Sequence, residues 1–408
     1  MKPILRRGSK KGKGRKLWSA CVSPVGSFFC YTLPRMPRVL SSSFVRSLFF
    51  VIGGSIGAGM FGLPALFAQS GRLWGSVLYW AVVGVVLLIH MAYAELQAKA
   101  GSKHDLAGIA KRSLGKRGWL VAMVVYPISV YGAVLVYLLL GAQFLAALSH
   151  MLGGPTSPFI WQTLLWIFFA WGAHKGVKGV AKFERPITVF LVLGLLSATI
   201  AAALSGKVPV FLEGPPSFSV AAFIGVVFFS AITLPLIAEV MAFDGRKSII
   251  GRHSLVIGTL AAALLKWLFA LSFMGVAIGG RIEVMGLMQA LPVGLRWLLP
   301  LVGFLAISGS AVSVLDSLRI VYRDEFSFRP SSAWLLAVLP PLALVQVSQG
   351  ALLPLMTFLG SFVAATNALL VCIVALVERT RLIGRLPRVM MYLAIGLCLF
   401  TIAHTFIL

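Results

Sequence analysis

The chain of 408 residues has little charge and very little negative charge: Asp, Glu, Lys and Arg make up 12% of it, and only 11 residues are acidic. Soluble domains carry roughly 25% charged residues. Since 59% of this chain is hydrophobic, the composition excludes an ordinary soluble protein. The 36 Lys and Arg leave a formal net charge of +25, which in a soluble chain would indicate nucleic-acid binding, so the positions of the basic residues matter.

Cysteine and histidine motifs are also missing. The four cysteines form no CxxC pair and the six histidines form no HxxxH or HExxH motif, so the sequence indicates no disulfide framework, no metal site and no cofactor. Prolines interrupt the segment that follows the basic stretch Lys2 to Lys16, so a signal peptide is not indicated either. We expect residues 1–43 to be a disordered, basic cytoplasmic tail, with Met36 as an alternative start of translation.

Long hydrophobic runs fill the chain from Phe44 onward. A helix needs about 20 apolar residues, each rising about 1.5 Å, to cross a hydrocarbon core of about 30 Å. We predict eleven membrane-spanning helices, at residues 44–68, 75–97, 119–148, 159–173, 186–206, 218–243, 254–280, 297–318, 333–347, 350–377 and 387–408. The fourth and ninth runs are short enough to be re-entrant, and Pro340 and Pro341 weaken the ninth as a straight helix.

The basic residues support this count, because cytoplasmic loops collect Lys and Arg. With a cytoplasmic amino terminus and an outer carboxyl terminus, 31 of the 36 basic residues fall on the inner side, and the outer loops hold only Arg72, Lys207, Arg281 and Arg296. Removing either short helix would reverse the side of every later basic cluster. The positive charge is therefore a topology signal with some attraction to anionic lipid, and nucleic acid is not an expected partner.

The first predicted helix carries five glycines and a proline within residues 53–64. An interior Gly costs about 1 kcal/mol against Ala and an interior Pro about 3 kcal/mol, so a simple anchor would not carry them. Such a break is tolerated where the freed main-chain groups line a cavity or contact other protein, and the half-helix ends can then bind substrate. The simpler alternative is close helix packing through small residues. Gly57, Gly59 and Gly62 have the spacing of a dinucleotide-binding fingerprint, GxGxxG. We reject that interpretation, because no strand precedes them.

A second break is predicted in the sixth helix, at residues 228–235, FFSAITLP. Ser, Thr and Pro also occur in intact membrane helices, so the argument rests on position. The segment lies five helices after the first break, and because five is odd, a second five-helix unit that began there would be inverted in the membrane. We predict repeats at 44–206 and 218–377 and an additional helix at 387–408.

Together these motifs resemble those of the amino acid/polyamine/organocation superfamily, and within it the aromatic amino acid (tyrosine/tryptophan) permeases and the amino acid/auxin permeases. The segment IGAGMFGLP is similar to the helix 1 motif of these families, and FFSAITLP to their helix 6 break. The segments AYAEL, YGAVLVY and GSAVSVLDSL resemble parts of helices 2, 3 and 8, in the same order. The resemblance implies an all-α LeuT-like fold of 5+5 inverted repeats plus one helix, and proton- or sodium-coupled uptake of an amino acid.

The resemblance also implies that the main chain of both breaks binds the amino and carboxylate groups of the substrate. The predicted substrate-binding residues are Ser55, Ile56, Gly57, Ala58, Gly59, Phe61, Tyr131, Phe228, Ser230, Ala231 and Thr233. Main-chain recognition fits the sequence, because Glu95, Glu239 and Asp316 all lie toward cytoplasmic ends and leave no acid at mid-depth to pair with an ammonium group. For the three aromatic residues, ordinary packing is the alternative to a place in the side-chain pocket.

Lys266 is a charge deep inside a predicted helix, where it costs about 3 kcal/mol and cannot easily reach the surface. Ionisable groups at this depth are functional by default, so Lys266 is a coupling candidate, and donation to helix-end carbonyls is the alternative. Sodium carriers of the superfamily use a hydroxyl pair on helix 8, but Leu305 and Ala306 stand there. Ser308 and Ser310 lie nearby but not at the positions of that pair, and both are candidates for ion coupling. We therefore expect the coupling ion to be a proton rather than sodium.

Arg46 and Asp316, at the inner ends of helices 1 and 8, are predicted to form a cytoplasmic gate, and two unrelated interfacial charges are the alternative. The predicted function is proton-coupled uptake of a neutral amino acid, with an aromatic one suggested, by a permease in the bacterial inner membrane. A non-transporting receptor on the same fold is the alternative, and a uniport channel is a further one. An intramembrane enzyme has only the isolated Ser310 and His404 in its favour. The sequence leaves open which amino acid is carried, in which direction, and in what oligomeric state.

Overall fold

The computed structural model describes residues 42–100, 106–176, 184–205, 219–243, 249–276, 284–348, 352–378 and 385–406, which all lie in the unit Pro37–Leu408. Every regular element in these ranges is helical. Most of the predicted cytoplasmic tail, with Met36, lies outside the described residues, as do several of the basic loops.

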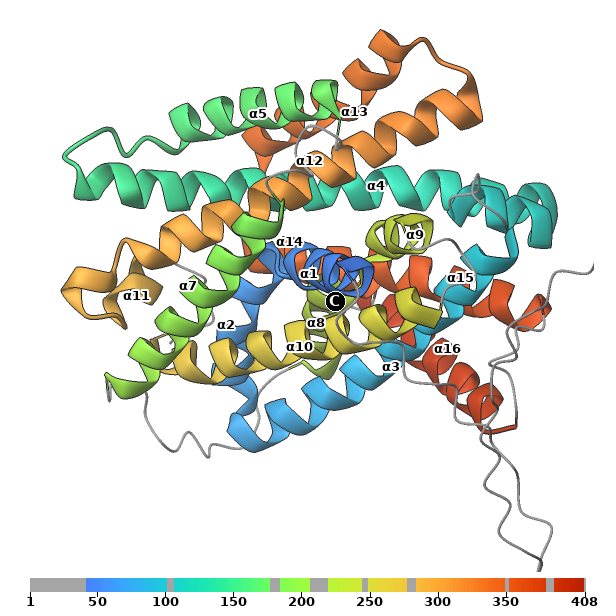
Figure 1. Cartoon of the computed structure of the whole chain (residues 1–408), viewed down its shortest axis with the longest axis horizontal. Helices are drawn as coiled ribbons and strands as arrows, with labels where there is room; N and C mark the ends of the chain where they lie inside the picture. Colours follow the sequence, from blue (N-terminus) through green and yellow to red (C-terminus); the bar gives the residue numbers. More distant parts are fainter. Residues whose placement is uncertain are drawn as a thin grey trace, which may run out of the picture. The chain divides into compact units, whose positions relative to one another are not determined.

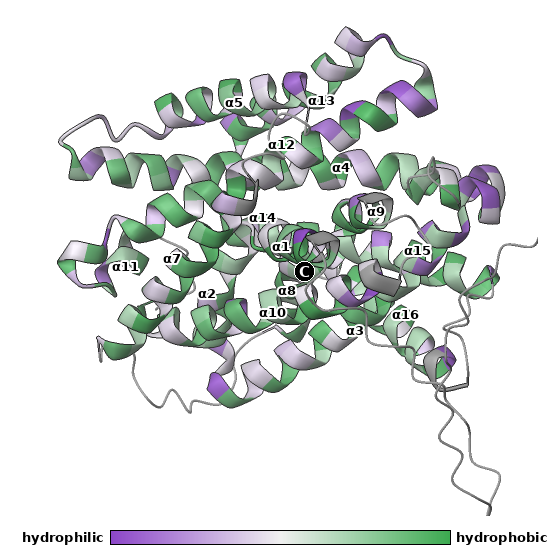
Figure 2. Ribbon diagram, in the orientation of Figure 1, coloured by the Kyte–Doolittle hydropathy of each residue, from purple (hydrophilic) through white to green (hydrophobic). Residues whose placement is uncertain are grey.

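The helices follow the hydrophobic runs of the sequence. Their order is α1 (Ser42–Ser55), η1 (Ala58–Gly62), α2 (Leu63–Ser70), α3 (Arg72–Ala100), α4 (Leu106–Met151), α5 (Pro158–Lys175), α7 (Glu184–Leu204), α8 (Val220–Ala231), α9 (Leu234–Phe243), α10 (Ile249–Phe273), η2 (Met274–Val276), α11 (Val284–Gln289), η3 (Val293–Leu295), α12 (Leu298–Phe326), α13 (Pro330–Val347), α14 (Leu352–Phe358), the π-helix η4 (Leu359–Ala364), α15 (Ala365–Val377) and α16 (Arg385–Thr405). Figure 2 shows hydrophobic residues along these helices and hydrophilic ones toward many of their ends.

Nine helices in the described ranges are long and apolar enough to cross a membrane, and α1 together with η1 and α2, bent by 47° at a break, would make a tenth. Each of the eleven predicted runs contains helix. The predicted fourth run is α5, an unbroken helix of 18 residues that is not among the nine. The predicted weakness of the ninth run is not seen, because α13 continues through Pro340 and Pro341. A proline in a membrane helix is tolerated where neighbouring groups satisfy the freed carbonyls.

Some helices extend beyond the predicted runs. The run predicted at 119–148 follows a polar helical segment that begins at Leu106, and the two meet at Gly115, whose φ of 68° and ψ of −155° are not helical and suit a residue without a side chain. The predicted eighth helix continues eight residues past 318, to Phe326. The short helix α11 and the π-helical turns of η4 carry no distinct hydrophobic period, so pattern alone could not find them.

Two groups of helices can be distinguished by their contacts. In one, α4, α5, α12 and α13 pack on one another, and Figure 1 shows them together along the upper side of the view. In the other, α1 and α2 pack with α10, and α3 packs with α8, α9 and α10. The helix α7 contacts both α1 and α12, and α15 contacts both α3 and α4. The two broken segments therefore lie in the second group and face the first.

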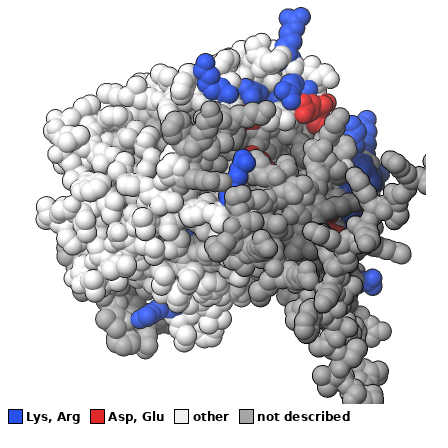
Figure 3. Space-filling view, in the orientation of Figure 1, with Lys and Arg blue, Asp and Glu red and all other residues white. Residues whose placement is uncertain are grey.

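Basic side chains mark one end of the helices. Lys111, Arg112, Lys116 and Arg117, at the start of α4, are exposed, as is Arg323 near the end of α12. In the space-filling view of Figure 3, Lys and Arg gather along the upper and right edges of the visible face. This end of the helices corresponds to the predicted inner side.

Candidate functional site

The first break separates α1 from η1 and α2. The helix α1 ends at Ser55, and Gly57 is extended, with φ −133° and ψ −166°. The N–H of Ile56 still donates to Ile52 O at 3.1 Å, and Met60 N–H donates to Gly57 O at 3.3 Å. The last carbonyls of α1 and the first N–H groups of the new helical segment, at Ala58 and Gly59, lack the helical partners that an unbroken helix would supply.

The second break separates α8 from α9. Ile232 is extended, with φ −80° and ψ 113°, and its N–H donates to Phe228 O at 2.9 Å, which ends α8. The next helix, α9, begins at Leu234 and has Pro235, which lacks an N–H, in its first turn. The two breaks touch directly, because a Cβ built on Gly59 would lie 2.5 Å from Ser230 Cα.

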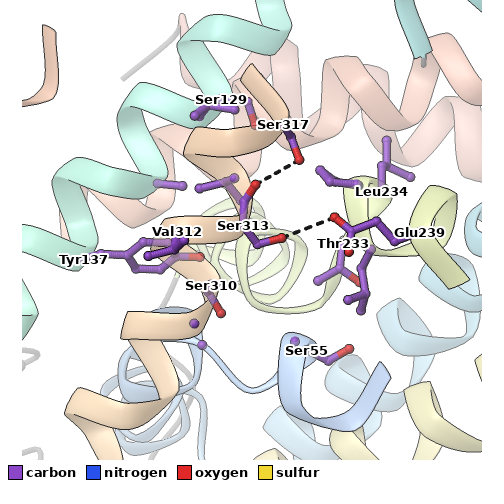
Figure 4. A pocket seen from close by; sticks show the side chains of 18 of the residues that line it. Ser55, Ser129, Tyr137, Thr233, Leu234, Glu239, Ser310, Val312, Ser313 and Ser317 are labelled. Carbon is purple, nitrogen blue, oxygen red and sulfur yellow. Dashed lines mark hydrogen bonds between the residues drawn. The ribbon is translucent and has the colours of Figure 1, made fainter. Parts of the chain in front are cut away.

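A cavity of about 940 Å³ begins at these breaks, a volume typical of small-molecule sites. Both breaks contribute to its wall, together with α3, α4, α5, α7, α12 and α15, and Figure 4 shows side chains converging on it from several of these helices. The lining reaches Asp324, whose side chain is 56% exposed, so the cavity meets the surface at the basic end of the helices. On the opposite side of the first break, Phe61 packs edge-on against Phe144 and Phe269 at centroid distances of 4.8 and 5.5 Å.

Polar atoms without partners gather in the cavity wall. The side-chain oxygens of Ser55, Ser230, Thr233 and Asn367 are buried and have no hydrogen-bond partner within the described part of the chain. A buried polar atom left unsatisfied costs about 1–3 kcal/mol, and in native proteins such atoms are few. Four of them around one cavity indicate a place for a polar ligand.

The hydroxyls of α12 form hydrogen bonds mostly within their own helix. Ser308 donates to Phe304 O at 2.7 Å and Ser310 to Ala306 O at 3.1 Å. Ser313 donates to the carboxylate of Glu239 on α9 at 3.4 Å, a bond drawn as a dashed line in Figure 4. The hydroxyl of Tyr137 and that of Ser310 each lie 3.7 Å from the Cβ position of Gly57, so both face the first break.

Two buried side chains form hydrogen bonds with the main chain of the second break. Lys266 of α10 donates from Nζ to Ser230 O, the carbonyl near the end of α8. His90 of α3 accepts the N–H of Thr233 at Nε2, at 3.4 Å, and its Nδ1 lies 3.4 Å from Thr259 Oγ1. Lys266 is 2% exposed and His90 is fully buried.

The structure separates ten of the eleven predicted substrate-binding residues into three sets. The cavity is lined by Ser55, Gly57, Ala58, Gly59, Ser230 and Thr233. Ile56, Phe61 and Phe228 are buried, and none of them is among the residues that line it. Ala231 lines a separate small void beside Lys266.

Tyr131 does not lie in the cavity wall, where the resemblance to the permease families had suggested it. Its hydroxyl pairs with Tyr322 Oη at 2.6 Å and donates to Leu336 O at 2.7 Å, which places it between α12 and α13. Six residues, or about one and two-thirds turns, further along α4, Tyr137 lines the cavity instead. An α-helix turns about 100° per residue, so a wrong choice within one helix places a side chain on the wrong face.

The predicted gate residues lie on α1 and α12, two helices that contact each other. Arg46 is exposed near the start of α1, and Asp316 is buried in α12. Asp316 forms an ion pair with Arg319, three residues further along the same helix. Among the coupling candidates, Ser308 and Ser310 line the cavity, whereas Lys266 lies behind the second break.

The comparisons with known proteins agree with this geometry. The profile of the tryptophan/tyrosine permease family matches residues 40–396. The chain belongs to this family. The permease is therefore a multi-pass membrane transporter and not an enzyme, which removes the intramembrane-enzyme alternative.

Individual relatives are distant. The permease is 20% identical over 231 residues to "Glutamine transporter 2" of Aliivibrio fischeri, a match that covers 55% of this chain and 59% of that relative's length. The structure of MhsT in complex with L-phenylalanine superposes with a TM-score of 0.63 at 14% identity, covering 88% of this chain and 97% of MhsT. Mhp1, a nucleobase-cation-symport-1 transporter, gives 0.60 at 15% identity, with 88% and 91% covered. These likenesses show the LeuT-like fold that the sequence motifs implied.

Proposed function

We propose that the permease is a secondary active transporter that takes up a neutral amino acid, first of all an aromatic one, by proton-coupled alternating access around the two breaks. One observation carries the proposal. The two broken helices touch at Gly59 and Ser230, and their free main-chain groups border a cavity with four unpartnered buried oxygens. A non-transporting receptor on the same fold is the alternative.

The carboxylate and ammonium groups of an amino acid have partners of opposite charge at the first break. The N-terminal end of the segment Ala58–Ser70 carries the positive end of a helix dipole and free N–H groups, which suit a carboxylate. Gly53 and Gly54, near the end of α1, line the cavity, and the carbonyl groups at a helix end suit an ammonium group. The hydroxyls of Ser55, Tyr137 and Ser310 lie beside these groups and can complete their hydrogen bonds.

The rest of the wall supports an apolar side chain on the substrate. Most of its residues are apolar, and its aromatic members include Phe168, Trp171, Phe229 and Phe304. Such walls favour aromatic and aliphatic groups by burial and ring contacts. The family name and the L-phenylalanine bound to MhsT point in the same direction.

Protons are the proposed coupling ion, because Leu305 and Ala306 stand where the resemblance implies the hydroxyl pair of a sodium site. Ser308 and Ser310 form bonds inside α12, and Leu305 and Ala306 supply no oxygen from their side chains. A sodium ion would need several convergent oxygen ligands.

The proposed topology has eleven crossings, an inner amino terminus, an outer carboxyl terminus, and placement in a bacterial inner membrane. The contacts support inverted repeats at 44–206 and 218–377 followed by the helix at 387–408: the first break packs with α8 and α10, and α4 and α5 pack with α12 and α13. Helices 1 and 2 thus associate with 6 and 7, and helices 3 and 4 with 8 and 9, as two related repeats would. In this orientation the cavity faces the cytoplasm.

Uptake of a labelled amino acid panel into proteoliposomes tests the proposal. We expect accumulation of a neutral amino acid under an inward proton gradient and no response to sodium. Binding without any uptake would favour the receptor, and uptake that never exceeds equilibrium would favour a uniporter. Accumulation driven by sodium alone would contradict the proposed ion.

A further inference from the structure

Lys266 bridges the region between the two breaks. Its amine donates to Ser230 O at the end of α8, and Lys266 also lines a small void together with Ser55, the last residue of α1, and Ala231. Since the carbonyl end of a helix carries partial negative charge, an ammonium group is a natural partner for it. The lysine therefore lies where a bound cation would join the two broken helices.

The void beside Lys266 shares the lining residue Ser55 with the substrate cavity. Its volume is about 10 Å³, close to that of one water molecule. Ser55 lines both this void and the large cavity, and its buried hydroxyl has no partner among the described residues. A hydroxyl both donates and accepts, so Ser55 can pass a proton between Lys266 and the cavity.

His90 binds the main chain of the second break three residues after Ser230, the partner of Lys266. Its Nε2 accepts the Thr233 N–H, which requires that nitrogen to carry no proton and places the ring proton on Nδ1, toward Thr259. The imidazole lies within electrostatic range of Lys266. A proton on Nε2 would break the bond to Thr233, and two buried positive charges side by side would repel each other. Tyr79 of α3 also lines the void, and its hydroxyl donates to Ala263 O at 2.9 Å.

We propose that Lys266 is the proton-coupling site of the permease, that Ser55 relays its proton to the cavity, and that His90 keeps the site to a single positive charge. The inference rests on the proposed transport function and deepens it. The protonated amine bridges Ser230 O and the void beside Ser55, which holds the breaks together. When the proton leaves through Ser55 to the cavity, the neutral amine retains only a weaker, uncharged hydrogen bond, and the two breaks can separate.

The test separates gradient-driven uptake from exchange. Purified wild-type permease and Lys266→Met are compared in proteoliposomes, by uptake under an inward proton gradient and by counterflow, in which internal unlabelled substrate exchanges with external label. We expect the wild type to respond to the gradient by at least about fivefold, the lower end of usual coupling between two sites. Lys266→Met should lose this response and keep counterflow.

Lys99→Met is the matched control, because Lys99 also donates to a main-chain carbonyl, that of Glu378, at 2.8 Å, but lies exposed at the end of α3. It should keep both activities. A Lys266→Met variant that still accumulates substrate like the wild type would overturn the inference. If the wild type itself moves no amino acid, the proposed function fails first, so the two failures are distinct.

If Lys266→Met does not fold, Ser55→Ala decides the matter, since it removes only the relay hydroxyl. Ser55 also lines the substrate cavity, so its loss lowers counterflow as well, and we expect gradient-driven uptake to fall at least about fivefold further than counterflow does. An equal loss of both activities, or an unchanged response, would show that Ser55 does not carry the proton and would overturn the relay.

Discussion

Substitution of Gly59 by alanine tests whether the contact between the two breaks is essential for transport. A Cβ at this position would lie 2.5 Å from Ser230 Cα and 2.9 Å from Ser230 N and Cβ. Ordinary contacts begin at 3.4 Å, so the end of α8 would have to retreat by about 0.9 Å. The obstructing atoms are mainly backbone, which cannot turn aside as a flexible side chain can.

The expected cost follows from this displacement. Overpacking of a tight core costs about 1–3 kcal/mol, which is less than the usual stability of a folded domain, so Gly59→Ala should still fold. If the breaks touch in some states of the transport cycle and separate in others, the added Cβ destabilises only the states in which they touch. A differential cost of about 1–3 kcal/mol shifts the populations by about 5–150-fold. We expect the initial rate of uptake by Gly59→Ala to be about 5–150-fold lower than that of the wild type.

Two other glycines provide controls for the same assay. A Cβ at Gly57 would lie 3.7 Å from the hydroxyls of Ser310 and Tyr137, which is ordinary contact, so Gly57→Ala should raise KM by occupying cavity space without separating the breaks. Gly84 is exposed in α3 with nothing within 4 Å of its Cβ position, so Gly84→Ala should leave transport unchanged. Wild-type rates in Gly59→Ala, or equal losses in Gly59→Ala and Gly84→Ala, would refute the reasoning. Thermal unfolding in detergent confirms that each variant folds.

Three further predictions concern Tyr131, Asn367 and the pair of Arg46 and Asp316. Tyr131→Phe should lower the free energy of unfolding by about 1–2 kcal/mol, because two hydrogen bonds are lost, and should leave KM unchanged; a raised KM would place Tyr131 in the substrate path after all. Asn367→Leu should alter competition between substrates that do and do not carry a side-chain N–H or O–H, because its buried oxygen is unpartnered beside the cavity; identical competition profiles would exclude that role. If Arg46 and Asp316 form a gate, each charge-reversal variant should lose uptake and the exchanged pair should recover it, whereas additive losses would indicate two independent charges.

The fold was largely predictable because lipid imposes a simple rule on the chain. A backbone in hydrocarbon must satisfy its own hydrogen bonds, so a hydrophobic run of sufficient length is a helix. The first break was visible because glycines are costly in helices, and Gly59 proves to be required by a backbone contact. Helix ends were less predictable, as at Phe326, because a polar segment extends the helix beyond the hydrophobic run.

The candidate site was predictable only where its residues adjoin a break. Ser55 and Thr233 followed from the motifs, and both line the cavity. His90 and Asn367 were missed, because a single His or Asn in a membrane helix has no pattern of its own, and each acquires its place only when helices far apart in the sequence pack together. Tyr137 is a different error: the segment was correct, but the face of the helix was not.

The two breaks differ in what partners their main-chain groups have, and this difference suits them to different roles. The first break is built of glycines, and its groups at Gly57 to Gly59 border the cavity. The second break contains no glycine, and two of its main-chain groups already have partners in Lys266 and His90. In the proposed function, the first break binds both ends of an amino acid. In the proposed coupling, the second break, held by two titratable side chains, responds to the proton. Its sequence resembles an ordinary helix because its partners come from elsewhere.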